Sequence, residues 1–232
     1  MLMLYTYPRG FGQFSLSPFC VKAAAYLKLS GLDWTRRDLD DPRKMPLAKL
    51  PVLNAEQRLI PDSHNIRRYL ESRGAVFDAD LGDTQRAQSH ALIRMAEEHL
   101  YFNLVLDRWG DDRVWPTIRE VYFAKVPALL RRPVADGLRR RLLRGLSTHG
   151  IARFTPGERL ARVEEDLRAI QTCLWQGPYL MGNRPSSADL SVGPMLAAIR
   201  ATPVATPLAR RVAEDAQLSD YIDRLEDAVP LP

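Results

Sequence analysis

The sequence of 232 residues contains only two cysteines, Cys20 and Cys173, and none of the long apolar runs that cross membranes. Two isolated thiols exclude a scaffold built on disulfides and favour a reducing compartment. A membrane-spanning helix needs about 18 consecutive apolar residues, and no stretch of this chain comes near that length. Residues 1–7 are apolar but lack the basic leader and the small-residue cleavage site of a signal peptide. We therefore expect a protein of the cytoplasm with no membrane span.

Motifs that hold metals and nucleotides are also missing. The four histidines have no histidine partner four residues away, and neither cysteine has the spacing of a zinc ligand. Gly10 and Gly12 follow an apolar run, but Ser15 stands where a dinucleotide-binding loop has its third glycine. No phosphate-binding loop and no serine-hydrolase motif occurs. The sequence therefore predicts no bound metal and no bound nucleotide.

One basic segment departs from the mild net charge of +5. Arginines crowd residues 131–144, where leucines separate them. Such a segment could bind an acidic membrane surface or nucleic acid. Arginines three and four residues apart also lie together on one side of a helix, so the favoured interpretation is the solvated face of an amphipathic helix. We expect no nucleic-acid partner.

The hydrophobic pattern divides the chain near residue 75. Hydrophobic residues make up 46% of the sequence, enough for a sizeable core. Before residue 75, apolar runs and turn residues predict the order strand, helix, three strands and helix. Ser17 and Pro18 fit the N-cap and the first position of the first helix.

From residue 84 onward nearly all segments predict helices. These cover residues 84–108, 115–130, 134–146, 156–176, 186–201 and 218–228. Ser186 and Asp189 have the spacing of a capping box at the start of the helix over 186–201.

Four short motifs carry a family resemblance. They are Ser-Pro-Phe-Cys at residues 17–20, Lys-Leu-Pro-Val-Leu at 49–53, the pair Asp62 and Ser63 before a helix, and the capping segment 179–189. With a small α/β unit in front of an all-helical one, these motifs resemble the glutathione S-transferase superfamily. Ser-Pro-Phe-Cys, together with residues 98–101, 108–109 and 149–153, is similar to the metaxin and failed-axon-connection-like branch.

The resemblance implies an α/β plus all-α protein with the glutathione-transferase fold. We expect a thioredoxin-like, glutathione-binding domain over residues 1–76 and a helical C-terminal domain over residues 84–232. The implied activity is that of a glutathione transferase, which adds the thiolate of its co-substrate glutathione to a small hydrophobic electrophile. A homodimer is implied in the same way.

Two residues compete for the catalytic role. Ser17 fits a plain N-cap, and the resemblance adds a function, because its hydroxyl and the first helical turn would stabilise the glutathione thiolate. Cys20, one turn later, could form a mixed disulfide with glutathione, although free cysteines are commonly core residues. Redox-active relatives carry cysteine at the position that Ser17 occupies here. We therefore favour Ser17, and conjugation over thiol–disulfide exchange.

The resemblance also assigns residues that hold the tripeptide. Leu50, Pro51 and Val52 match a cis-proline segment, whose open backbone edge at Leu50 would pair with glutathione like an added strand. Asp62 and Ser63 cap the next helix and would hold the γ-glutamyl end.

The electrophile pocket is expected between the two domains. Its candidate residues are aromatic side chains of the first loop and of the helical domain: Phe11, Phe14, Tyr101, Trp109 and Tyr122. An aromatic residue on a helix also fits the core.

Two alternatives from other functional classes remain open. One is a non-catalytic member that serves as a binding or assembly module, since fold does not fix function. The other is a glutathione-dependent thiol oxidoreductase that uses Cys20.

Overall fold

The computed structural model describes all 232 residues. The N-terminal part of the protein contains a four-stranded mixed sheet. The strands are β1 (Leu2–Thr6), β2 (Trp34–Asp38), β3 (Val52–Ala55) and β4 (Arg58–Pro61). Their spatial order is β2-β1-β3-β4, with β1 parallel to β2 and antiparallel to β3. Helices α1 (Pro18–Leu29) and α2 (Ser63–Ser72) complete this unit. The expected order of strands and helices is confirmed, and so is the glutathione-transferase type of fold.

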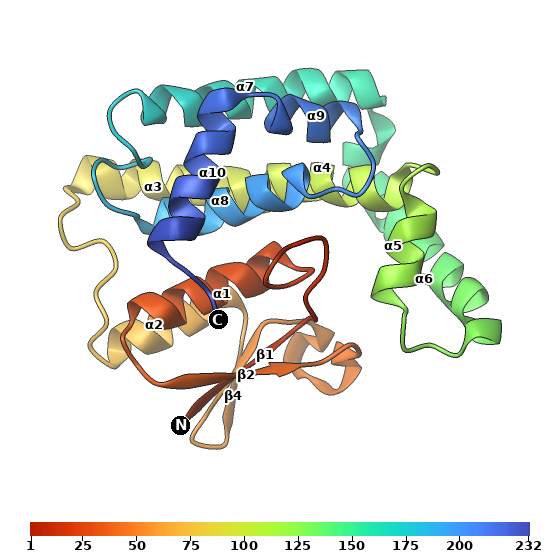
Figure 1. Ribbon diagram of the computed structural model, residues 1–232, viewed down its shortest axis with the longest axis horizontal. Helices are drawn as coiled ribbons and strands as arrows, with labels where there is room; N and C mark the ends of the chain where they lie inside the picture. Colours follow the sequence, from red (N-terminus) through yellow and green to blue (C-terminus); the bar gives the residue numbers. More distant parts are fainter.

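The rest of the chain is helical (Figure 1). Its helices are α3 (Asp83–Met95), α4 (Tyr101–Val105), α5 (Trp115–Tyr122), α6 (Ala128–His149), α7 (Pro156–Leu174), α8 (Ser187–Arg200), α9 (Pro207–Ala213) and α10 (Ala216–Ala228). One π-helical stretch (Ala96–Leu100) joins α3 to α4, and another (Leu106–Gly110) extends α4. None of the helices combines the length and the apolar character that a membrane crossing requires.

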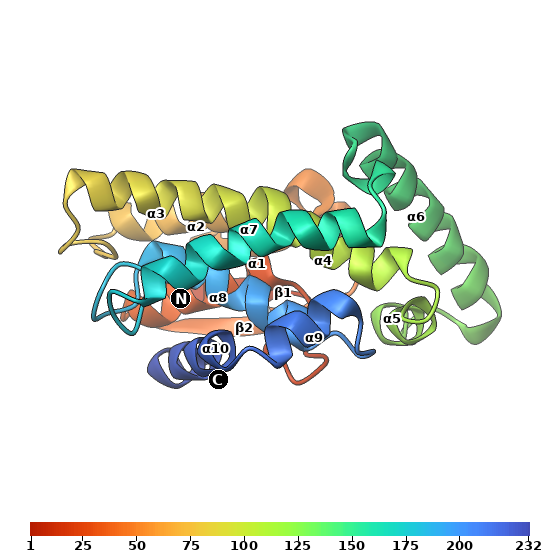
Figure 2. The same cartoon turned by 90° about the horizontal axis from the view of Figure 1, so that it is seen from above.

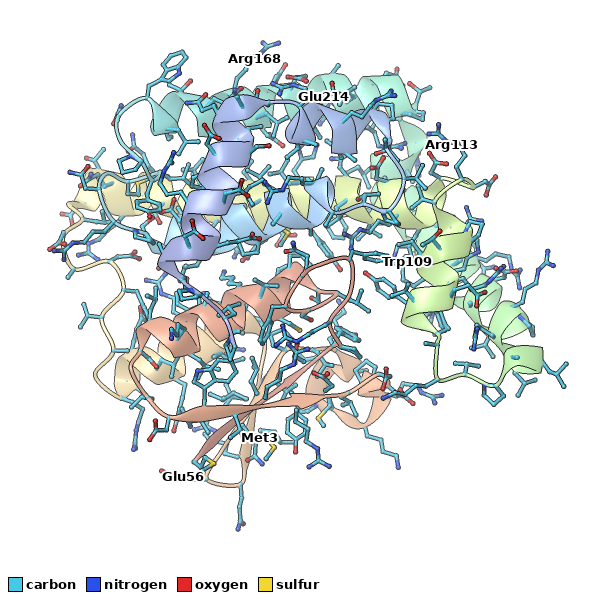
Figure 3. The ribbon with its side chains drawn as sticks, in the orientation of Figure 1. Met3, Glu56, Trp109, Arg113, Arg168 and Glu214 are labelled. Carbon is cyan, nitrogen blue, oxygen red and sulfur yellow. The ribbon has the colours of Figure 1, made fainter.

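Helix α8 is the centre of the helical part. Every residue from Ser187 to Ile199 is buried, including the polar Ser187, Asp189 and Ser191. Helices α1, α3, α9 and α10 all pack against it, and α7 crosses above it (Figures 1 and 2). The sheet unit, where Met3 and Glu56 are labelled, and the helical region of Arg168 and Glu214 lie at opposite ends of the molecule (Figure 3).

Two expectations about the helices need correction. The segment 115–130 is not one helix, because α5 ends at Tyr122 and Pro127 precedes the separate helix α6. Helix α9 was not expected, although Thr206 and Pro207 supply the N-cap and first-position residues that begin it. The Thr206 hydroxyl accepts a hydrogen bond from the Ala209 N–H at 3.1 Å.

Asp189 fixes the start of α8. Its carboxylate is fully buried and accepts hydrogen bonds from the N–H groups of Leu180 and Ser186, at 2.9 and 2.8 Å. The hydroxyls of Ser186 and Tyr221 donate to it as well, at 2.6 and 2.9 Å. The expected capping box is therefore present, and it also ties α8 to α10 and to the loop before it.

Replacement of Asp189 by Ala should lower the free energy of unfolding by about 2–4 kcal/mol, because four buried donors lose their acceptor. Urea unfolding followed by circular dichroism measures the loss. The matched control is Glu158→Ala in the exposed capping box of α7, where a loss of about 1 kcal/mol or less is expected. Equal losses in the two variants would contradict a special role for the buried box.

Candidate functional site

A cleft of about 760 Å³ lies between the sheet unit and the helical unit, a size typical of small-molecule sites. Its walls come from the first half of α1, the segment 46–51, the turn that begins α2, and one face of the long helix from α3 to α4. Helix α1 runs antiparallel to that helix, because Phe19 contacts Tyr101 with 4.8 Å between ring centroids while Lys22 pairs with Glu97. At 1.5 Å per residue, the wall from Arg86 to Tyr101 is about 22 Å long.

Ser17 stands at the start of α1 and lines this cleft. It occupies the N-cap position, yet its side chain makes no capping hydrogen bond. A plain N-cap is defined by a hydrogen bond from a first-turn N–H to its side-chain oxygen, and Ser17 does not make that bond. The hydroxyl is left near the positive end of the α1 dipole, where it can donate to an anionic group in the cleft.

Cys20 does not reach the cleft. Its side chain is 0% exposed and packs with Leu50 and Val52 beneath the cleft floor. Burial raises the pKa of the Cys20 thiol above its ordinary value, and hydrogen bonds from Thr6, the Tyr7 backbone and Ser17 offset only part of this rise. A buried thiol with a raised pKa is a poor nucleophile at neutral pH.

The segment around Pro51 presents an open backbone edge. The Leu50–Pro51 peptide bond is cis, and both residues line the cleft. None of the backbone hydrogen bonds outside the helices and strands involves Leu50, so its N–H and C=O are free for a ligand. Val52, the first residue of β3, is fully buried and supports this edge from below.

Asp62 and Ser63 differ in their access to the cleft. Asp62 is exposed, lines the cleft and caps α2 by accepting from the His64 N–H at 2.8 Å. Its own N–H donates to the Pro51 carbonyl at 3.1 Å, which ties the start of α2 to the open edge. Ser63 is only 2% exposed and is not part of the lining.

The cleft wall contains a buried ion pair that no sequence motif indicated. Lys22 of α1 pairs with Glu97, although both side chains are almost completely buried. Glu97 also pairs with Arg94 and accepts from the Ser191 hydroxyl at 3.3 Å. Lys22 is the one charged residue in the buried stretch 22–27, and a buried charge requires a partner. The sequence could therefore indicate that Lys22 needs an acidic partner, but it does not identify that partner as Glu97.

Two tyrosines lie beside Ser17 at the end of the cleft. Tyr7 follows β1 and Tyr101 begins α4, and both line the cleft. Burial raises the pKa of Tyr101 to about 12 and that of Tyr7 above its ordinary value. Both phenols therefore stay protonated at neutral pH and can act as hydrogen-bond donors.

The other predicted pocket aromatics lie elsewhere. Trp109 packs against Trp115 and Tyr122, with ring centroids 5.2 and 5.6 Å apart, and Figure 3 shows it near α5. Phe11 belongs to the same aromatic cluster, and Phe14 packs edge-on against Trp34 across the sheet. These rings pack against aromatic partners outside the cleft, and only Tyr101 of the five lines it.

Charge near the start of α2 is balanced. His64 and Arg67 from α2 and Arg94 from α3 line the cleft together with the carboxylates of Asp62 and Glu97. Burial lowers the pKa of His64, and the nearby Lys22 ammonium lowers it further, so His64 is neutral at pH 7. No group of three or more His, Cys, Asp or Glu side chains that could hold a metal ion is found.

Comparison with known proteins gives matches over most of the chain. Residues 18–114 match the family model of the glutathione S-transferase N-terminal domain, and residues 163–225 match that of the C-terminal domain. The isoprene-epoxide–glutathione S-transferase of Rhodococcus sp. (strain AD45) is 29% identical over 233 residues, which cover 97% of this chain and 98% of that protein.

Two further relatives extend the comparison. The Failed axon connections protein of Drosophila melanogaster is 25% identical over 92% of this chain and 54% of its own length. A solved glutathione transferase of Phanerochaete chrysosporium has a TM-score of 0.64 at 17% identity, with 100% of this chain and 98% of that chain covered. The last likeness concerns the fold alone.

The placement of the two thiols predicts their reactivity. In the native protein, Cys20 should not react with a disulfide reagent at neutral pH, whereas Cys173, which is partly exposed, should react slowly. Spectroscopic thiol titration before and after unfolding measures both. In a Cys173→Ser variant no thiol should titrate until the protein unfolds. A rapidly reacting thiol in that folded variant would contradict the burial of Cys20.

Proposed function

Because this chain belongs to the glutathione S-transferase family and conjugates glutathione to a small electrophile, we propose that the cleft holds the tripeptide with its sulfur at Ser17. The observation that carries this proposal is the Ser17 hydroxyl, which lines the cleft at a helix start without capping the helix. Donation from this hydroxyl and the positive end of α1 stabilise the thiolate, and the thiol proton leaves to solvent.

The open edge at Leu50 binds the backbone of the tripeptide. Its free N–H and C=O support pairing of the added-strand kind, which needs no side chain. The exposed carboxylate of Asp62, next to this edge, attracts the γ-glutamyl ammonium. The N–H groups of the first turn of α2 suit the γ-glutamyl carboxylate, whereas the buried Ser63 side chain contributes less.

The electrophile binds at the Ser17 end of the cleft, beside Tyr101 and Phe102. The thiolate forms a carbon–sulfur bond there, and the bond from that carbon to its leaving group breaks. The Rhodococcus relative is named for an epoxide, which supports a small epoxide as the electrophile. In that case the ring oxygen leaves as an alkoxide, and a protonated phenol such as Tyr101 can donate to it.

The buried thiol of Cys20 supports conjugation over thiol–disulfide exchange. We extend the proposal to a homodimer in the cytoplasm. The family resemblance supports the dimer, and the two unpaired cysteines support a reducing compartment.

Replacement of Ser17 by Ala should lower kcat/KM for glutathione conjugation by about 10- to 100-fold, because a hydrogen bond to a charged sulfur is lost. The pKa of the bound thiol should rise, since the donor stabilises only the charged form. Ultraviolet absorbance of the thiolate against pH measures that pKa, and initial rates with small epoxides measure the activity.

Cys20→Ala, three residues after Ser17, is the matched control, and it should keep the thiolate pKa of the wild type. Unchanged activity in Ser17→Ala, or loss of activity in a folded Cys20→Ala alone, would reverse the assignment.

Replacement of Asp62 by Asn should weaken glutathione binding by about tenfold or more, because the amide oxygen can still cap α2 while the charge is lost. Calorimetric titration with glutathione measures the affinity, which for the wild type should lie in the micromolar to millimolar range, about −8 to −4 kcal/mol. The control Asn65→Asp adds a carboxylate on the same helix, and it should not weaken binding. Equal binding by wild type and Asp62→Asn would remove Asp62 from the site.

A further inference from the structure

Helices α5 (Trp115–Tyr122) and α6 (Ala128–His149) form an arm that extends from one end of the molecule (Figures 1 and 2). Within the arm, Trp115 and Ile118 of α5 pack with Ala135 of α6. The arm is anchored at its base, where Leu146 packs against Val105 and Leu106. Many side chains on the opposite face of α6 are exposed, so they are available to a partner.

That free face carries exposed apolar side chains. Leu129 is 94% exposed, Leu130 55%, Val134 49% and Leu138 47%. Single exposed apolar residues are ordinary, whereas a group of four on ten residues of one helix marks an interaction surface.

The same face carries arginines without carboxylate partners. Two other arginines of α6 do have partners: Arg131 pairs with Glu120, and Arg139 pairs with Asp112, at the side of α6 that faces α5. Arg140, Arg141 and Arg144 are exposed and have no carboxylate within ion-pair distance. Their positive charge is uncompensated in a chain whose net charge is already +5.

Three of the apolar residues and one of the arginines lie on one side of the helix. Leu130, Val134, Leu138 and Arg141 follow one another at intervals of four, four and three residues, the spacing of a single helical face. The apolar residues occupy the first three turns, and the unpaired arginines follow directly behind them. A lipid surface offers a partner to each group, hydrocarbon for the apolar side chains and anionic headgroups for the arginines.

We propose that the exposed face of α6 docks on an anionic phospholipid surface. Leu130, Val134 and Leu138 enter the boundary between acyl chains and headgroups, and Arg140, Arg141 and Arg144 bind headgroup phosphates. The helix lies on the surface and does not span it. This inference goes beyond the proposed function and is independent of it, because none of these residues lines the cleft.

Two other occupants fit less well. A second copy of the chain, docked face to face, would bring six unpaired arginines together, which repel one another. A nucleic acid would satisfy the arginines through its phosphates, but it offers no apolar phase for Leu130, Val134 and Leu138. The lipid surface matches both groups at once.

The test is co-sedimentation of the full chain with vesicles. Vesicles of equal parts phosphatidylglycerol and phosphatidylcholine should bind the protein, and vesicles of phosphatidylcholine alone should bind it far more weakly. The triple variant R140Q/R141Q/R144Q should lose about fivefold in partitioning for each arginine, or about 100-fold in total. The variant L130Q/V134Q/L138Q should lose more than roughly tenfold.

A matched charge control is R58Q/R68Q/R168Q, which removes three exposed arginines outside the arm (Figure 3 marks Arg168). It has the same net charge as the arm variant and should bind like the wild type. Raising the salt to about 1 M, where the Debye length falls to about 3 Å, should release the wild type in part. Equal losses in the control and the arm variant would overturn the proposal.

A second measurement does not depend on variants. Hydrogen exchange of residues 128–149 in the wild type should slow when anionic vesicles are added, while that of α7 should not change. Unchanged exchange in α6 would overturn the proposal. Two further results would overturn it if vesicles bind no protein. One is binding of duplex DNA by both the wild type and L130Q/V134Q/L138Q. The other is a dimer of the wild type that dissociates in L130Q/V134Q/L138Q.

Discussion

The burial of α1 on both sides is the constraint on which the rest of the structure depends. Residues Ala23 to Leu27 are buried, with α2 packed on one side and α8 on the other. The helix therefore belongs to the sheet unit and to the helical unit at the same time, and it can neither slide nor turn without opening both cores. Its first residues, and Ser17 before them, are held at a fixed place beside the cleft.

The Lys22–Glu97 pair sets how the two units meet along that helix. A buried pair contributes little net stability, but separating it leaves uncompensated charges out of water. One register of α1 against the continuous helix from α3 to α4 satisfies Lys22, and that register also places Phe19 on Tyr101. The length and shape of the cleft follow from this register, since α1 and α3 supply facing walls. Docking of the arm makes no use of either wall, so the two surfaces can change independently.

Features that depend on neighbouring residues could be predicted from the sequence. Pro18 predicts the start of α1, because proline suits the first helical position, and Ser186 with Asp189 predicts the start of α8, because a capping box acts within one turn. The Leu50 edge and Asp62 were found through the family resemblance. Lys22 could be identified only as a charge in need of a partner, because Glu97 is 75 residues away. The sequence could not show which aromatic residues line the cleft, since each ring fits a core as well as a cleft. Tyr101 lines it, whereas Phe11, Phe14 and Trp109 do not.

By itself, the sequence determined the order of the strands and helices, the change to an all-helical part, and the chemistry available at the start of α1. These properties rest on periodicity, caps and turns, whose energies act over a few residues. The tertiary structure alone decided that Cys20 lies beneath the cleft while Ser17 lines it, that Ser63 is covered while Asp62 is exposed, and that many side chains on one face of α6 are exposed. Burial is a property of what packs from elsewhere in the chain, so no local pattern contains it.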